Sequence, residues 1–197
     1  MSILLCVSLI MHVGYCQGFP DIWVFPSQGP VVVGCLEQTV ATCIVAAAKQ
    51  NVTIAWRTDD LPHSVEETET RHDNGTATTR SELKMIPKWK MYRMNVKCIV
   101  VLDGMFKDER TFTMQNIHFA PHMVIIEDFS HGDASLHFLC HCEANPPAEY
   151  SWRRGDQVIA SSSSIILPRD AEPAVYTCEV KNYLGVTTKN LKIETRH

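Results

Sequence analysis

The feature that most constrains this 197-residue chain is a series of cysteine, tryptophan and cysteine that occurs twice. Its members are Cys43, Trp56 and Cys98 in the first half, and Cys140, Trp152 and Cys178 in the second. The tryptophan follows the first cysteine by 13 residues in one copy and by 12 in the other, and the cysteines are 55 and 38 residues apart. The repeat predicts two domains of one kind, divided near the stretch IHFAPHM at residues 117–123.

The segments around these residues are short β-rich runs such as MNVKCIVV and AVYTCEV, separated by turn-forming stretches such as HDNGT and NPP. No long run has a helical period, which favours an all-β fold. In an immunoglobulin-like sandwich, a disulfide joins strands B and F of facing sheets and the strand C tryptophan packs on it. We therefore predict two tandem immunoglobulin-like β-sandwiches with disulfides Cys43–Cys98 and Cys140–Cys178 and with Trp56 and Trp152 in their cores.

The second half also carries a tyrosine two residues before its last cysteine, at Tyr176. This is the position of the tyrosine corner in such domains, so we expect Tyr176 in the core. The first half has Val96 at that position and a longer gap between its cysteines. We therefore expect a constant-like first domain at residues 17–118 and a compact second domain, C2-like or I-like, at residues 119–197.

The N-terminal run SILLCVSLIMHV has the length of a signal-peptide core and is too short to span a bilayer. We predict a signal peptide at residues 1–16, with cleavage after Gly18 as an alternative cut, and with a buried first strand or an uncleaved anchor as alternative interpretations. Removal of Cys6 and Cys16 would leave six cysteines, an even set that fits an oxidising compartment. The prediction is a secreted protein or the extracellular part of a cell-surface membrane protein.

Several stretches resemble one protein family. They are ATCIVAAAKQNVTIAW, NGTATTRSELKMIP, VKCIVVLDGMFKDERTFTM, LCHCEANPPAEYSW and VYTCEVKNYLG, and together they extend over about residues 35–195. They resemble the second and third extracellular domains of nectins and related poliovirus-receptor-like adhesion proteins. The family's outer variable-type domain, which carries its principal trans-binding surface, has no counterpart between the predicted signal and the first unit.

The resemblance implies non-catalytic cell adhesion or cell-surface receptor recognition. The expected partners are cell-surface proteins, with nectin-family members among the candidates and lateral self-association as a further mode. The alternative is a secreted decoy or immune-modulating protein, of viral or host origin, without a membrane anchor. A formal net charge of −4 argues against a nucleic-acid partner.

The stretch HFLCHC at residues 137–142 invites a zinc interpretation, because thiolate and imidazole are the usual zinc ligands. Structural zinc sites space their cysteines two to four residues apart, whereas a strand sends His137 and His141 to the face opposite Cys140 and Cys142. We therefore predict no metal, no cofactor and no catalytic residue. A metal-dependent or thiol-dependent secreted enzyme is the remote third hypothesis.

Cys35 and Cys142 remain without a predicted intradomain partner. The resemblance places Cys140 at the family's strand B cysteine, so Cys142 points into the core, where we expect a buried free thiol. A bridge between Cys35 and Cys142 would have to link the two domains and is disfavoured. A bridge from exposed Cys35 to another chain is the other alternative.

Two sequons, Asn51-Val-Thr and Asn74-Gly-Thr, lie in the first domain. In an exported chain both are acceptors for N-linked glycans, so we predict modification of Asn51 and Asn74.

Three other motifs have ordinary explanations. The serines at 161–164 lack a G-x-S-x-G elbow and are expected in a solvated loop, which argues against an enzyme with a small-molecule substrate. Arg154-Gly155-Asp156 has the integrin-recognition letters but also fits a hairpin turn. Lysines and an arginine at residues 88–97 alternate with aromatic residues, and we expect a polar loop with a buried tryptophan or tyrosine beneath it.

Overall fold

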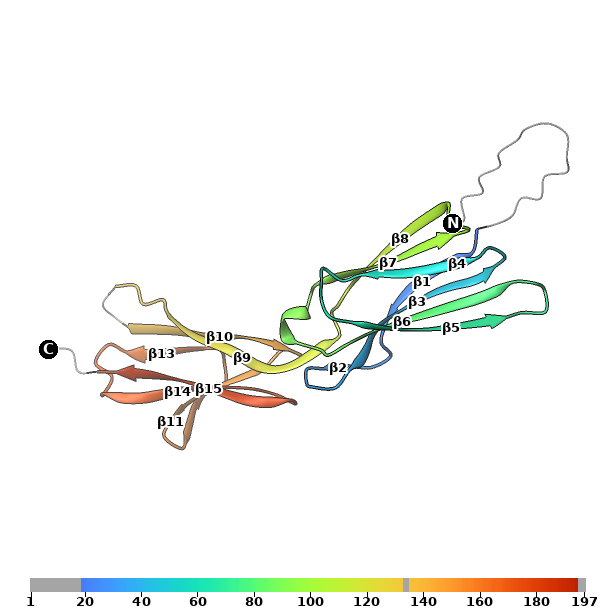
Figure 1. Cartoon of the computed structure of the whole chain (residues 1–197). Coiled ribbons are helices and arrows are strands. Elements are labelled where there is room, and N and C mark those ends of the chain that lie inside the picture. Colours follow the sequence, from blue (N-terminus) through green and yellow to red (C-terminus); the bar gives the residue numbers. More distant parts are fainter. Residues whose placement is uncertain (1–18, 133–134, 195–197) are drawn as a thin grey trace. The chain divides into compact units, whose positions relative to one another are not determined.

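The computed structural model describes residues 19–132 and 135–194, except for the side chains of residues 106 and 107, so the predicted signal peptide lies outside the described residues (Figure 1). The chain forms two compact units, the first ending at Asn116 and the second beginning at Ile117. Apart from one 3-10 turn, the regular elements of the described residues are β-strands. The predicted all-β fold with two tandem immunoglobulin-like sandwiches is confirmed.

The first unit contains two antiparallel sheets. Its elements are β1 (Asp21–Pro26), β2 (Val31–Val32), β3 (Gln38–Ala48), β4 (Val52–Arg57), β5 (Ser64–Arg71), β6 (Ala77–Met85), η1 (Trp89–Met91), β7 (Asn95–Leu102) and β8 (Phe106–Thr113). One sheet has the order β1-β3-β6-β5 and the other β4-β7-β8. With β1 and β3 as strands A and B, this is the ABED and CFG arrangement of constant-type domains.

A disulfide joins the two sheets of the first unit. Cys43 on β3 and Cys98 on β7 are bonded with an S–S distance of 1.99 Å, and both are fully buried. Trp56 on β4 lies directly across from Cys98 in the strand register and packs on this core while half-buried. Its indole Nε1 donates a hydrogen bond to Ser81 Oγ on β6 at 3.1 Å, so the tryptophan also bridges the sheets.

The second unit repeats this plan with a different division of strands between its two sheets. They are β9 (Ile117–Asp128), β10 (Ser135–Asn145), β11 (Glu149–Arg154), β12 (Gln157–Ala160), β13 (Ser164–Pro168), β14 (Ala174–Asn182) and β15 (Gly185–Ile193). One sheet contains β13, β10 and β9 in that order, and the other has the order β12-β11-β14-β15. In the second unit the edge strand β12 follows β11 and pairs with it. Among the described residues, no strand of the second unit corresponds to β5 of the first.

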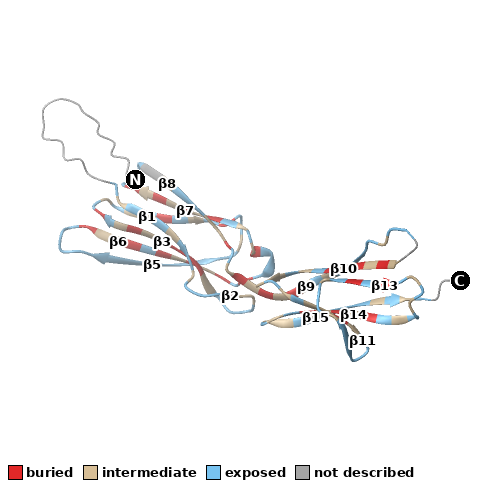
Figure 2. Ribbon diagram, turned by 180° about the vertical axis from the view of Figure 1, so that it is seen from behind, coloured by how far each residue is buried: buried red, intermediate tan, exposed pale blue. Residues whose placement is uncertain are grey.

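The core of the second unit is built around its own disulfide. Cys140 on β10 and Cys178 on β14 are bonded at an S–S distance of 2.12 Å. Trp152 lies across from Cys178 in the register and is fully buried, and Tyr176 is buried in the same cluster. In Figure 2 buried and exposed residues alternate along the strands of both units, as expected where one face of each sheet packs inward.

The segment at residues 88–97 differs from the prediction in one respect. It forms η1 and then enters β7, and the side chain buried beneath it is Met91. Trp89 is exposed, and the Tyr92 ring lies 5.0 Å from the Arg93 guanidinium. Met91 takes the buried place because the 3-10 turn sends it inward, and its flexible thioether fills irregular core space.

Candidate interaction surface

The histidine- and cysteine-rich stretch of β10 is structural. Cys140 is bonded to Cys178, so its thiolate is not available to a metal. His141 faces outward, with Nε2 3.3 Å from Glu127 Oε1, and His137 Nε2 lies 2.7 Å from Ser135 Oγ. Within residues 19–132 and 135–194, no group of three or more histidine, cysteine, aspartate or glutamate residues could hold a metal ion.

The two unpaired cysteines lie in different environments. Cys35 is exposed in the bend between β2 and β3. Cys142 is half-buried against the core of the second unit, and its Sγ lies 3.4 Å from Tyr150 Oη. The expected inward direction of Cys142 agrees with this packing, although its burial is incomplete.

The serine run and the Arg-Gly-Asp stretch lie in turns and at the strand ends beside them, Ser164 at the start of β13 and Arg154 at the end of β11. Ser162 Oγ donates to the Ser164 carbonyl at 2.6 Å, which stabilises the local turn. Gly155, with φ +58°, forms the turn between β11 and β12. The Arg154 guanidinium donates to Glu172 Oε2 at 2.9 Å and lies over the Tyr176 ring, so the arginine serves the fold of its own unit.

Two aromatic side chains are exposed on the outer face of the β1-β3-β6-β5 sheet. Along β1, Ile22 and Val24 pack against the core, whereas Trp23 and Phe25 alternate with them and point outward. Trp23 is 43% exposed and Phe25 is 45% exposed. Trp23 pairs with Ile44 of β3, whose side chain lies on the same outer face. We call Trp23, Phe25 and Ile44 the aromatic face.

This face was not predicted from the sequence. The run DIWVFP is apolar at both alternating positions, whereas a strand with one solvated face normally alternates apolar with polar residues. That departure is the signal that could have identified it.

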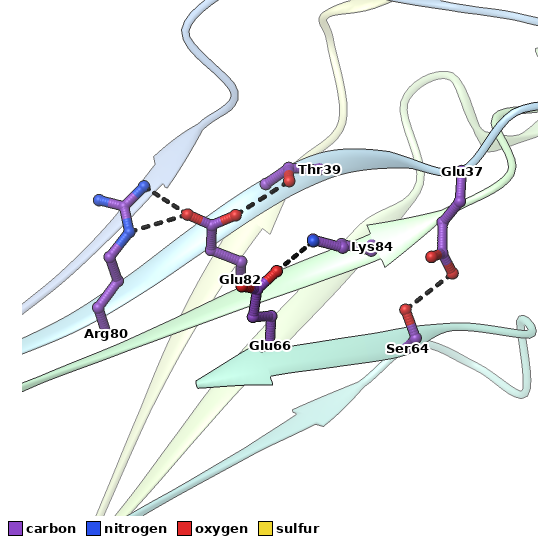
Figure 3. A network of polar contacts seen from close by, with 7 residues as sticks. All are labelled: Glu37, Thr39, Ser64, Glu66, Arg80, Glu82 and Lys84. Atoms are coloured by element: carbon purple, nitrogen blue, oxygen red, sulfur yellow. Dashed lines mark hydrogen bonds and ion pairs between the residues drawn. The ribbon is translucent and has the colours of Figure 1, made fainter. Parts of the chain in front are cut away.

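Charged side chains on β6 border the aromatic face, since Arg80 lies across from Ile44 in the strand register. Figure 3 shows the contacts of these charged side chains. Arg80 donates from Nε at 2.9 Å and from a terminal nitrogen at 2.7 Å to Oε1 of Glu82, and Thr39 Oγ1 donates to Oε2 at 3.1 Å. The hydrogen bonds from Arg80, together with that from Thr39 and the charges of Arg80 and Lys84, lower the pKa of Glu82 below its usual value, against an opposing effect of burial. Arg80 and Glu82 are therefore fixed as a charged pair beside Ile44.

The polar row continues onto β5. Lys84 Nζ binds Glu66 Oε2, and Ser64 Oγ donates to Glu37 Oε1 at 2.7 Å (Figure 3). The hydrogen bond to Glu66 raises the pKa of Lys84. These contacts extend the row of polar side chains from β6 to β5, at the edge of the sheet opposite β1.

A shallow groove of about 500 Å³ runs between the aromatic and the charged side chains. One wall is formed by Phe25, Pro26 and Ile44, and the other by Arg80 and Glu82. Exposed aromatic residues beside an oriented arginine are the composition enriched in protein–protein interfaces. The arrangement can bury apolar area and place a charge-assisted contact.

Comparisons with known proteins agree with this fold. Residues 26–110 match the CD80-like C2-set immunoglobulin domain family. The ectodomain of mouse nectin-like molecule 4 superposes with a TM-score of 0.68 at 18% identity, over 88% of this chain and 62% of that one. Nectin 1b of Danio rerio is 34% identical over 122 residues, which are 58% of this chain and 21% of that protein. Residues 26–110 are therefore similar to an immunoglobulin-type domain, and the chain is similar to a nectin over part of its length.

The chain is also similar to human sialic acid-binding Ig-like lectin 12, with 28% identity over 134 residues, 56% of the chain and 22% of the lectin. It spans between about a fifth and a third of the length of the curated relatives it matches. These relatives are a nectin and sialic acid-binding Ig-like lectins, and the similarity covers little more than half of this chain. Among the described residues, no helix is long and apolar enough to cross a membrane.

Proposed function

We propose that this chain is a non-catalytic extracellular module that binds cell-surface proteins in adhesion or receptor recognition, and that the aromatic face makes the contact. The observation that carries the proposal is the position of Trp23 and Phe25, which are nearly half exposed on a strand whose alternate side chains, Ile22 and Val24, pack against the core. Leaving two aromatic side chains in water forgoes burial worth about 1.5–3 kcal/mol for a large apolar side chain. A partner that covers them recovers this free energy.

The proposed partner is a nectin-family ectodomain. The similarity to nectin 1b and the fold shared with nectin-like molecule 4 support this choice. The Arg80–Glu82 pair beside the apolar wall presents one positive and one negative group. An immunoglobulin-type surface with both acidic and basic residues around its apolar centre would complement it. A second copy of this chain is the partner for lateral self-association.

The test is binding of the purified, secreted chain to a panel of nectin-family ectodomains and to itself, measured by surface plasmon resonance. We expect Trp23→Ala and Phe25→Ala to weaken binding at least about tenfold, because aromatic residues at the centre of an interface carry much of the binding free energy. Trp89→Ala is the matched control, since Trp89 is also 43% exposed but lies in η1.

Circular dichroism and thermal unfolding establish that each variant remains folded. Absence of binding to every member of the panel, the chain itself included, would contradict the proposed function. Equal losses in Trp23→Ala and Trp89→Ala would contradict the assignment of the contact to the aromatic face.

A further inference from the structure

The fold brings both sequons to one end of the first unit. Asn51 directly precedes β4, and Asn74 lies in the turn between β5 and β6, 23 residues later in the chain. Both residues are exposed. A cavity of about 300 Å³ is lined by Asn51 from the first sequon and by Gly75 and Thr76 from the second.

The backbone N–H and the carbonyl of Asn51 both form hydrogen bonds with Asp103. Its N–H donates to Asp103 Oδ1 at 2.8 Å, and its carbonyl accepts from the Asp103 N–H at 2.9 Å. Asp103 belongs to the Asp-Gly turn that joins β7 to β8 and has φ +51°. These two hydrogen bonds fix the point from which any group attached to Asn51 would extend.

Asn74 is oriented differently. Its Oδ1 accepts hydrogen bonds from the Thr76 N–H at 3.1 Å and from Thr76 Oγ1 at 2.7 Å. Gly75 between them has φ +77°, a conformation that favours glycine. The Asn74 side chain thus belongs to its own turn, whereas Asn51 is the asparagine that contributes to the cavity wall.

The cavity wall is rich in hydrogen-bonding side chains. Lys49 and Arg71 carry donors, Glu69 carries acceptors, and Gln50 and His72 offer both. No aromatic residue and no leucine, isoleucine or methionine lines the cavity. A ligand that fits this wall has closely spaced hydroxyl and amide groups and no large apolar face, which is the chemistry of an N-acetylhexosamine.

We infer that Asn51 carries an N-linked glycan whose first N-acetylglucosamine residues lie in this cavity. The attachment makes the contact intramolecular, so a weak sugar interaction is populated through the high effective concentration of a short tether. The bound sugars cover this end of the first unit and leave the aromatic face to protein partners. The inference relies on the extracellular location in the proposed function and is independent of which partner is bound.

The first experiment maps glycopeptides of the full chain secreted from mammalian cells by mass spectrometry. We expect an N-linked glycan at Asn51. An unmodified Asn51 in the secreted chain would overturn the inference, even if the chain binds its partner normally.

The second experiment measures release of the Asn51 glycan by peptide:N-glycosidase F from native and from denatured protein. We expect release to be about tenfold slower from the native chain relative to the denatured chain, since sugars held in the cavity are shielded from the enzyme. The double variant Glu69→Ala/Arg71→Ala removes an exposed ion pair of 2.8 Å from the cavity wall. It should raise the release rate of the native chain most of the way to that of the denatured chain.

The control is Asp108→Ala/Arg110→Ala, which removes a partly exposed pair of 2.7 Å on β8, outside the cavity lining. This variant should leave the slow native release unchanged. Equal rates from native and denatured chain, or slow release that persists in the cavity variant, would overturn the inference, because shielding would then be absent or would come from the fold at large.

Discussion

The Sγ atom of Cys142 on β10 lies 3.4 Å from the phenolic oxygen of Tyr150 on β11. Both side chains pack against the disulfide-centred core of the second unit. Burial of the phenol, and then its hydrogen bond with Cys142, raise the pKa of Tyr150 to about 12. This contact gives Cys142, for which the sequence predicted no intradomain partner, a hydrogen bond beside the core of the second unit.

Tyr150 should titrate later than ordinary tyrosines. Because its folded pKa is raised, the stabilisation from the neutral phenol is fully present below the unfolded pKa near 10 and is lost as the pH rises through about 12. Ultraviolet difference titration should show one late phenol that is absent in Tyr150→Phe. A titration of Tyr150→Phe identical to that of the wild type would contradict this assignment.

Cys35 and Cys142 should differ in reactivity. In the native chain a thiol reagent should modify exposed Cys35 quickly and half-buried Cys142 at least about tenfold more slowly, since access limits the reaction. Mass mapping of alkylated peptides over time measures both rates. In denaturant the two rates should converge, and equal native rates would show that Cys142 does not pack in the core. If Cys35 proves unreactive, reduction should reveal a disulfide to another chain.

Each disulfide should stabilise its own unit. The loops of 55 and 38 residues correspond to about 4 kcal/mol apiece in the chain-entropy estimate, a large share of the roughly 5–15 kcal/mol that stabilises a typical domain. We expect Cys98→Ala and Cys178→Ala to abolish or strongly reduce secretion, as measured by immunoblotting of medium and cell lysate. Cys35→Ala is the control, and secretion of all three at wild-type levels would contradict the prediction.

The Arg80–Glu82 pair should contribute a small, acid-sensitive stabilisation. Since the pKa of Glu82 is lowered, its contribution is present above the reference value of 4.5 and is lost as the pH falls through the lower folded value. Glu82→Gln should reduce the free energy of unfolding at pH 7 by no more than about 1 kcal/mol, because the pair lies near the surface. The difference from wild type should vanish at lower pH, in denaturant melts that follow the first unit. A constant difference down to pH 2 would contradict the mechanism.

The repeated cysteine and tryptophan spacing could predict most of the fold, because local pattern determines which residues face inward along a strand. Trp56 and Trp152 each lie opposite the second cysteine of their unit, as expected for strand C beside strand F. The pattern could not distinguish Met91 from Trp89 as the buried residue, since a 3-10 turn changes which side chain points inward.

The aromatic face was beyond sequence reasoning for a related reason. Trp23 and Phe25 are apolar, and apolar residues in a strand are normally assigned to the core. Only the pairing of β1 with β3 shows that Ile22 and Val24 take the inward positions and leave both aromatic side chains outside.

By itself, the sequence determined the fold class, the two-domain organisation, the candidate sequons and the cysteines available for bridges, because these follow from residue type and spacing along the chain. Tertiary structure alone decided that Cys142 meets Tyr150, that Arg80 and Glu82 border exposed aromatic side chains, and that the two sequons share one cavity. Such contacts join residues far apart or on different strands, and their distances depend on register and on the packing of sheets, which composition and periodicity do not encode.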